Sequence, residues 1–212
     1  MSVGRFIALE GGEGAGKSTQ ARLLAEALRE RGLEVVLTRE PGGTAGGEAI
    51  RELLLDPKGP GWDPEAEALL FAAARSDHVA RLIRPALDRG AWVICDRFID
   101  STRAYQGGGG GLPDDAILAL HRVGSGGLLP DLTILLEASS DEIAARLSRR
   151  DGGESDRIGG REAEFHARVA QAFRRFADAE PARFARIDGS GPAEATHQAI
   201  LEAVAPLLPG KP

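Results

Sequence analysis

Several residue types and patterns are scarce in this chain of 212 residues. Cys95 is its only cysteine, which excludes an internal disulfide, and the apolar residues beside it predict a buried, unreactive thiol. No apolar run approaches the roughly 18 residues that indicate a membrane span. The chain passes from Met1 into a strand-like run, with no pattern typical of a signal peptide. From these features we expect a cytoplasmic protein that does not bind membranes.

Lysine and asparagine are also rare or missing. Only three of the 26 basic residues are lysine (Lys17, Lys58 and Lys211), and asparagine does not occur. The formal net charge is −6, which argues against a large nucleic-acid-binding surface. Hydrophobic residues make up 42% and charged residues 27%, as in a folded globular protein. The length suits a single domain spanning residues 1–212.

Short apolar runs alternate with helical patterns along the whole chain. Five short apolar runs predict strands: residues 5–10, which read as a buried strand, and residues 34–38, 91–95, 132–136 and 184–188. Helical spacing is predicted for residues 17–31, 48–55, 64–89 (with room for a bend), 113–123, 140–150, 161–179 and 193–208. This alternation predicts an α/β fold with a five-stranded parallel sheet and helices on both faces. Ligands of such sheets bind at the carboxyl ends of the strands.

A glycine-rich motif follows the first predicted strand. Residues 11–18 read GGEGAGKS and fit the phosphate-loop pattern G-x-x-x-x-G-K-[ST]. Glycines let the backbone amides curl around an anion, and the helix that follows adds partial positive charge. We expect Lys17 to reach the β- and γ-phosphates of a nucleotide and Ser18 to ligate Mg²⁺. The predicted nucleotide-binding residues are Gly11, Gly12, Glu13, Gly14, Ala15, Gly16, Lys17, Ser18 and Thr19.

Two alternative nucleotide-binding classes are disfavoured by the sequence. The dinucleotide pattern G-x-G-x-x-G cannot be placed here, because its third glycine would fall on Lys17. Guanine-specific switches usually read the base with an N-K-x-D segment, which a chain without asparagine cannot contain. ATP is therefore the favoured nucleotide.

Arginines lie at the predicted strand ends and around a polar, glycine-rich loop. Transfer to an acceptor phosphate brings two polyanions together, so arginines should converge on the site and no strong general base is needed. We expect the loop at 151–160 to be a lid. The arginines concerned are Arg39, Arg51, Arg97, Arg149, Arg150 and Arg157. Asp96, directly before Arg97, would orient Mg²⁺ through water.

Several motifs resemble those of bacterial thymidylate kinases. They are TREPGGT (38–44), FAAAR (71–75), DRF (96–98) with ST (101–102), AYQGGG (104–109), PDLT (130–133), DRI (156–158) and FH (165–166). They occur in the family's order over nearly the whole chain. The resemblance implies the P-loop nucleotide kinase fold and transfer of the γ-phosphoryl group of ATP to dTMP, giving dTDP and ADP. It also implies a homodimer, which nothing in the pattern of the helix at 64–89 requires.

The resemblance also implies roles for individual residues. Glu13 would bind the deoxyribose 3′-OH. Phe71 would stack on thymine, with Arg75 donating to its O4 and Thr102 at its edge. Tyr105, in a segment where a short helix could aim its ring into the crevice, would exclude a ribose 2′-OH. The remaining substrate residues are Gln106, which would close the nucleotide pocket, and Arg39, Arg51 and Arg97 beside phosphate. Lys17, Arg97, Arg149, Arg150 and Arg157 are the predicted catalytic residues.

The sequence departs from the family pattern at glycines. Residues 107–111 are all glycine where an arginine is often found, and Gly152 and Gly153 occupy part of the lid where relatives often have another. Gly159 stands where D-R-x-E is common. The sequence does not decide whether Arg149 or Arg150 is the catalytic arginine of the lid.

Two other functions remain open at this stage. One is a kinase acting on a different deoxynucleotide. The other is a switch or partner-binding module that hydrolyses ATP slowly, which the converging arginines disfavour because a switch needs only one. A panel of nucleoside monophosphates in an ADP-release assay separates the three.

Overall fold

The fold is built on one parallel sheet, seen in a computed structural model that describes residues 3–59, 61–139, 142–143, 146 and 157–209. Its strands are β1 (Phe6–Glu10), β2 (Val35–Arg39), β3 (Trp92–Asp96), β4 (Leu132–Glu137) and β5 (Phe184–Asp188). They lie in the order β2-β3-β1-β4-β5, and every neighbouring pair is parallel. The predicted five-stranded parallel sheet is thus confirmed.

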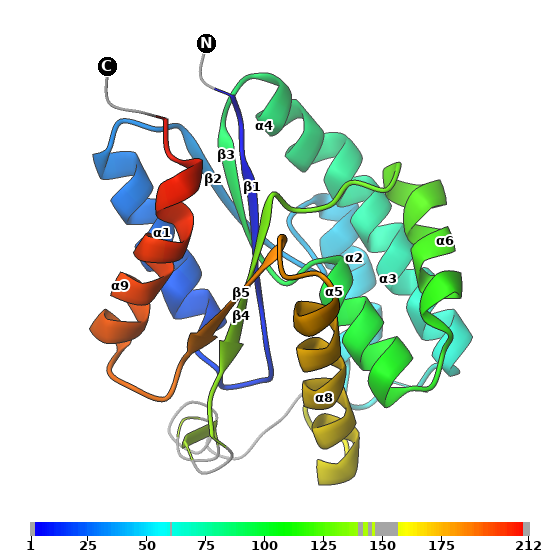
Figure 1. Ribbon diagram of the computed structural model, residues 1–212. Coiled ribbons are helices and arrows are strands. Elements are labelled where there is room, and N and C mark those ends of the chain that lie inside the picture. Colours follow the sequence, from blue (N-terminus) through cyan, green and yellow to red (C-terminus); the bar gives the residue numbers. More distant parts are fainter. Residues whose placement is uncertain (1–2, 60, 140–141, 144–145, 147–156, 210–212) are drawn as a thin grey trace.

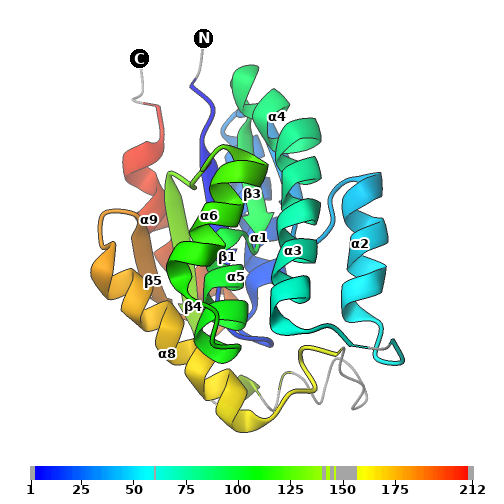
Figure 2. The ribbon, with the colours of Figure 1, turned by 90° about the vertical axis from the view of Figure 1, so that its right-hand side faces the viewer.

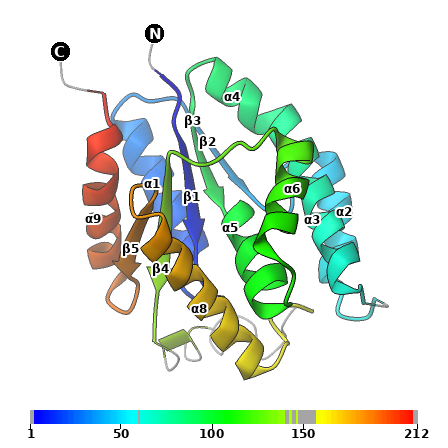
Figure 3. The same cartoon turned by 45° about the vertical axis from the view of Figure 1, so that its right-hand side comes forward.

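Helices cover both faces of the sheet (Figure 1). On one face lie α1 (Lys17–Glu30) and α9 (Ala193–Val204), which ends in a short 3₁₀ turn (Ala205–Leu207). The other face carries α3 (Pro64–His78), α4 (Arg84–Asp88), α5 (Ile99–Thr102), α6 (Asp114–Ser125) and α8 (Ala163–Ala179). Helix α2 (Ala45–Leu55) packs against α3 on the side away from α6, as Figures 2 and 3 show.

Apolar side chains fill the space between the layers. Leu24 and Leu28 of α1 meet Ile94 of β3 and Ile200 of α9 in one fully buried cluster. The other face holds two further clusters, one around Phe6 and Phe98 and one around Tyr105, Phe165 and Phe173. Cys95 is buried as predicted, and burial raises the pKa of its thiol, which fits an unreactive group.

The long helix predicted at 64–89 contains a change of helix type. Between α3 and α4 the segment Val79–Ile83 is a π turn, and Pro85 follows it in the first turn of α4. Proline has no backbone N–H and its ring crowds the carbonyl four residues earlier. The wider π turn accommodates that proline without ending the helix.

The glycine-rich stretch after α5 continues as a π turn at Arg103–Gly109, an element that the helical spacing of the sequence does not predict. Close packing against α8 accounts for it: a Cβ on Gly108 would lie 2.3 Å from the Ala172 Cβ, and one on Gly109 would lie 2.5 Å from the Phe165 ring. Tertiary contact overrides the low helix propensity of glycine here. The structure thus gives a physical reason for glycine at two positions of the run 107–111, within which the family often has an arginine.

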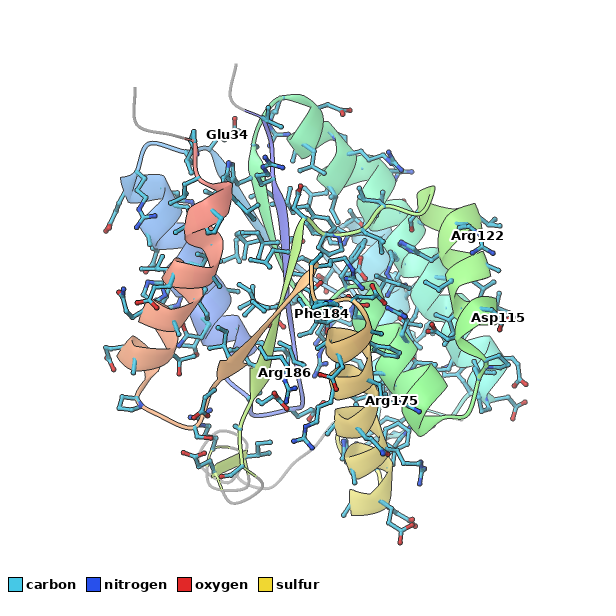
Figure 4. All side chains as sticks on the ribbon, viewed as in Figure 1. Glu34, Asp115, Arg122, Arg175, Phe184 and Arg186 are labelled. Carbon is cyan, nitrogen blue, oxygen red and sulfur yellow. The ribbon has the colours of Figure 1, made fainter. Side chains whose placement is uncertain are left out.

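Part of one predicted helix lies outside the described residues. Of residues 140–150 the structure describes only 142, 143 and 146, all helical. None of the helices in the described part of the chain is both long and apolar enough to cross a membrane. Glu34, labelled in Figure 4, lies directly before β2 and marks the side of the sheet where the strands begin. The carboxyl ends of the strands lie on the opposite side.

Candidate functional site

A cavity of about 490 Å³ opens at the carboxyl ends of β1, β2 and β3. Its lining brings together fifteen of the residues predicted from the sequence: Glu13, Gly14, Gly16, Lys17, Ser18, Thr19, Arg39, Arg51, Phe71, Arg75, Asp96, Arg97, Thr102, Tyr105 and Gln106. The phosphate loop and the predicted acceptor residues therefore share one cavity.

The phosphate loop joins β1 to α1. Gly11 has a φ of +139°, and a Cβ there would lie 2.4 Å from the Leu136 carbonyl oxygen, so only glycine fits. Lys17 Nζ donates to the carbonyl oxygens of Gly11 (3.1 Å) and Gly12 (2.6 Å). Burial, together with the nearby Arg97 charge, lowers the pKa of Lys17 from 10.5 to about 7. An anion in the loop would favour the charged form of this lysine.

Ser18 and Asp96 face each other at the start of α1 and the end of β3. The Ser18 hydroxyl donates a hydrogen bond to Asp96 Oδ2. Asp96 stands next to Leu9 of β1 in the sheet register, which sets its carboxylate beside the phosphate loop. A hydroxyl and a carboxylate side by side are oxygen ligands of the kind that Mg²⁺ accepts.

Arg97 has a backbone conformation that is unusual for a side-chain-bearing residue, with a φ of 70°. Its Nη1 donates to the Gly11 carbonyl oxygen and to Ser101 Oγ, both at 3.1 Å, and its Nη2 donates to Tyr105 Oη at 3.2 Å. The guanidinium also lies over the Tyr105 ring, 5.0 Å from its centroid. Arg97 thus spans the distance between the phosphate loop and the acceptor side of the cavity.

Arg75 is held on the acceptor side by a buried polar network. Its Nε donates to Glu40 Oε2 at 2.8 Å, and its Nη2 donates to Thr102 Oγ1 at 2.7 Å. The other Glu40 oxygen lies 2.9 Å from His78 Nδ1, and His78 Nε2 lies 2.7 Å from Thr38 Oγ1. Glu40 and His78 were not predicted as site residues. Glu40 lies inside the TREPGGT motif, but no single residue type in the sequence indicates that it orients Arg75.

The aromatic and amide side chains that the sequence predicts to contact the acceptor nucleotide have different neighbours in the structure. Phe71 is half-buried and lines the cavity. Tyr105 is 5% exposed. Its ring packs against Phe165 and Phe173, and the residue also lines the cavity. Gln106 Nε2 donates to Glu67 Oε1 at 2.8 Å. Arg161, after the predicted lid, donates to the other oxygen of Glu67 at 2.6 Å.

The remaining predicted arginines are placed differently. Arg39 forms a salt bridge with Glu48 (3.2 Å), and Arg51 Nη1 donates to the Pro41 carbonyl oxygen at 2.9 Å. Arg157 does not line the cavity. It donates instead to the carbonyl oxygens of Asp56 and Gly59, between α2 and α3.

Arg149, Arg150 and residues 151–156 of the predicted lid lie outside the described residues, so their assignments remain predictions. At the described end of the loop, a Cβ on Gly159 would lie 2.4 Å from Glu13 Oε2. The Glu13 carboxylate is the end of a flexible side chain, so this contact does not by itself require glycine at 159.

Arg146, which the sequence does not predict as a site residue, contacts the phosphate loop and also lines the cavity. Its Nη2 donates to the Gly189 carbonyl oxygen at 2.7 Å, and its Nη1 lies 3.4 Å from the carbonyl oxygens of Gly14 and Ala15. Beside it a second hollow of about 360 Å³ is lined by Thr19 and by residues between β5 and α9 such as Pro192. In the sequence alone, a functional arginine within a predicted helix looks the same as an arginine that is only solvated.

Comparisons with known proteins agree with this geometry. A family model described as "Thymidylate kinase" matches residues 9–200. A thymidylate kinase of Rhizorhabdus wittichii is 57% identical over 206 residues, covering 97% of this chain and 99% of that protein. One from Bradyrhizobium sp. strain ORS 278 is 49% identical, covering 95% and 89%. The crystal structure of thymidylate kinase from Ehrlichia chaffeensis has a TM-score of 0.76 at 36% identity, covering 97% of this chain and 99% of the other.

Proposed function

Because the chain belongs to the thymidylate kinase family, we propose that it transfers the γ-phosphoryl group of ATP to dTMP, giving dTDP and ADP. The observation that carries this proposal is the single cavity that joins the phosphate loop to Phe71, Arg75 and Thr102. A switch that only hydrolyses ATP slowly does not need a pocket for an acceptor nucleotide. A coupled ADP-release assay with dTMP, dCMP, dGMP, dUMP and no acceptor tests the proposal, and release that does not depend on an acceptor would contradict it.

On the donor side, the phosphate loop and Lys17 hold the β- and γ-phosphates. Lys17 exchanges its two carbonyl contacts for phosphate oxygens, so its charge lies where negative charge spreads in the transition state. We infer that the base of ATP occupies the hollow beside Arg146 and Pro192, because that hollow borders the same loop at Gly16. Substitution of Arg146 by alanine should therefore raise the KM for ATP more than the KM for dTMP.

On the acceptor side, the roles implied by the resemblance are physically consistent with the cavity. The half-buried Phe71 ring offers a stacking face, and the fixed guanidinium of Arg75 offers donors to a carbonyl oxygen. Arg97 and Arg51 line the path to the phosphate loop and would hold the acceptor phosphate in line with the donor. The acceptor oxygen is already anionic, so the proposal needs no general base.

Magnesium fits the pair formed by Ser18 and Asp96. When bound with ATP, Mg²⁺ neutralises charge on the β- and γ-phosphates. Ser18 would ligate the ion through its hydroxyl, and Asp96 would orient it through water. Ser18→Ala should raise the concentration of Mg²⁺ needed for half-maximal rate, which titration of activity against free Mg²⁺ measures.

Three proposals rest on the resemblance or on composition alone. They are the homodimer, the cytoplasmic location and the lid at 151–160. Sedimentation equilibrium at several protein concentrations tests the homodimer. A monomer at every concentration would contradict the dimer proposal. Hydrogen exchange tests the lid, which should become protected only when ATP and dTMP are both bound.

A further inference from the structure

Glu10 is a buried carboxyl group that the proposed mechanism does not use. It ends β1 directly before the phosphate loop, and its exposed fraction is 0%. Buried carboxylates are normally paired with a cation. Within the described part of the chain Glu10 forms no salt bridge. Its side chain must therefore be satisfied in another way.

The carboxyl group binds the turn that follows β3. Glu10 Oε1 accepts hydrogen bonds from the backbone N–H groups of Phe98 (2.8 Å) and Ser101 (3.1 Å). Glu10 Oε2 lies 2.5 Å from Ser101 Oγ. The Ser101 N–H also donates to the Phe98 carbonyl oxygen (3.1 Å), so Glu10 provides it with a second acceptor, and it provides the acceptor for the Phe98 N–H at the start of α5. One side chain thereby ties the end of β1 to the turn at 97–101.

That turn contains Arg97, whose left-handed backbone is unfavourable for a residue with a Cβ. Two contacts with β1 hold this backbone in place. Arg97 N donates to the Leu9 carbonyl oxygen at 2.9 Å, and Phe98 N donates to Glu10 Oε1. Ser101 Oγ, bound to Glu10, also accepts from Arg97 Nη1 at 3.1 Å. The chain of contacts runs from Glu10 through Ser101 to the Arg97 guanidinium.

We propose that Glu10 is a positioning residue for phosphoryl transfer, which fixes the turn at 97–101 and so aims the Arg97 guanidinium at the acceptor phosphate. This inference rests on the role proposed above for Arg97. Misplacement of a binding group by about 1 Å can lower a rate by about 100-fold. The contribution of Glu10 is therefore expected in catalytic efficiency with dTMP rather than in ATP binding.

The test compares kcat and KM in the parent protein and in Glu10→Gln, Glu10→Ala and Arg97→Ala. We expect kcat/KM for dTMP to fall about tenfold in Glu10→Gln, which keeps Oε1 but replaces the Ser101 acceptor, and about 100-fold in Glu10→Ala. The KM for ATP should stay within about twofold of the parent value. Glu137→Gln, at the end of the neighbouring strand β4 and outside the cavity, is the control and should behave like the parent.

A double-mutant cycle separates positioning from general structural damage. If Glu10 acts through Arg97, then Glu10→Ala adds little loss in a protein that already carries Arg97→Ala. An equal further loss in that background, or parental kcat/KM in a folded Glu10→Ala protein, would overturn the inference. If neither Glu10 variant folds, Ser101→Ala breaks the same chain of contacts and decides by the same cycle. If Arg97→Ala itself uses dTMP normally, the role proposed for Arg97 fails instead.

Discussion

Glu40 and Arg75 form a salt bridge that is almost completely shielded from water. Arg75 Nε lies 2.8 Å from Glu40 Oε2, and the two side chains are 2% and 4% exposed. Removing one partner of a buried pair leaves a charge without compensation, at a cost of about 3–5 kcal/mol. The pair also settles which donors of Arg75 remain for a ligand, since Nε is occupied and Nη2 is shared with Thr102.

We expect the parent protein to select thymine, and Glu40→Gln to weaken that selectivity. Arg75 would keep its charge but lose its fixed orientation, so the ratio of kcat/KM for dTMP over dCMP should fall by about tenfold or more. Rates with the two nucleotides at several concentrations measure this ratio. Glu34→Gln, exposed at the opposite edge of the sheet (Figure 4), is the control and should leave it unchanged. Equal rates of the parent with dTMP, dCMP and dGMP would sink the thymidylate assignment and leave only the kinase class.

Lys17→Ala should remove nearly all transfer activity while the protein still folds. Among the described residues, Lys17 Nζ donates to loop carbonyl oxygens, and we expect its loss to remove mainly transition-state charge stabilisation. The expected fall in kcat is about 100-fold or more, measured with dTMP and ATP both saturating. Lys58→Ala, an exposed lysine outside the cavity, should retain parental activity. Normal turnover in a folded Lys17→Ala protein would rule this mechanism out.

Tyr105 should make the enzyme prefer deoxyribose over ribose. Comparing kcat/KM for dTMP and ribothymidine monophosphate, we expect Tyr105→Ala to lose on the order of 1–3 kcal/mol of the discrimination. Tyr105→Phe keeps the ring but not the hydroxyl bound to Arg97, so it should keep most of the preference while lowering the rate. If Tyr105 only supports the core through Phe165 and Phe173, both substrates will slow together and their ratio will not change.

Gly108→Ala should destabilise the protein by about 1–3 kcal/mol, because the added Cβ overlaps Ala172 of α8. Gly191→Ala is the matched control, since nothing lies within 4 Å of a Cβ there, and its effect should stay within about 0.5 kcal/mol. Urea unfolding followed by circular dichroism measures both. Equal stability of the two variants would mean that α8 shifts freely away from the glycine run.

The stability of the parent should fall with rising pH relative to Glu10→Gln. Burial, with the nearby Asp100 carboxylate, raises the pKa of Glu10 to about 7 from an ordinary value of 4.5. Between these values the folded state holds a proton that the unfolded state has lost, so this group's contribution to stability declines as pH rises. Glutamine does not titrate, so the variant should gain on the parent between pH 5 and pH 8. If the parent and Glu10→Gln differed in unfolding free energy by the same amount at pH 5 and at pH 8, this prediction would be wrong.

The sequence predicts the sheet well and the polar contacts poorly. Strands β1, β3 and β4 are buried, mostly apolar runs, which local patterns locate readily. The edge strands β2 and β5 are only partly buried, and the apolar residues at their starts still mark them. The phosphate loop is equally local, because its glycines and Lys17 are adjacent in the chain.

The contacts that orient the site join residues far apart in the chain. Glu10 is 91 residues from Ser101, and Glu40 is 35 residues from Arg75. No local pattern marks such a pairing, which only the folded register brings together. Arg157 illustrates the same limit: its position at a glycine-rich loop flanked by arginines predicted a place in the cavity, whereas its guanidinium donates to the carbonyl oxygens of Asp56 and Gly59.

The two oxygens of Glu67 serve two different segments, Gln106 at the cavity and Arg161 at the start of α8. A carboxylate shared in this way couples its partners energetically, because a shift of either one alters the alignment available to the other. Such coupling is reciprocal for binding free energies. We therefore expect a ligand that fixes Gln106 also to restrain Arg161, and the reverse, because both side chains depend on the same carboxylate.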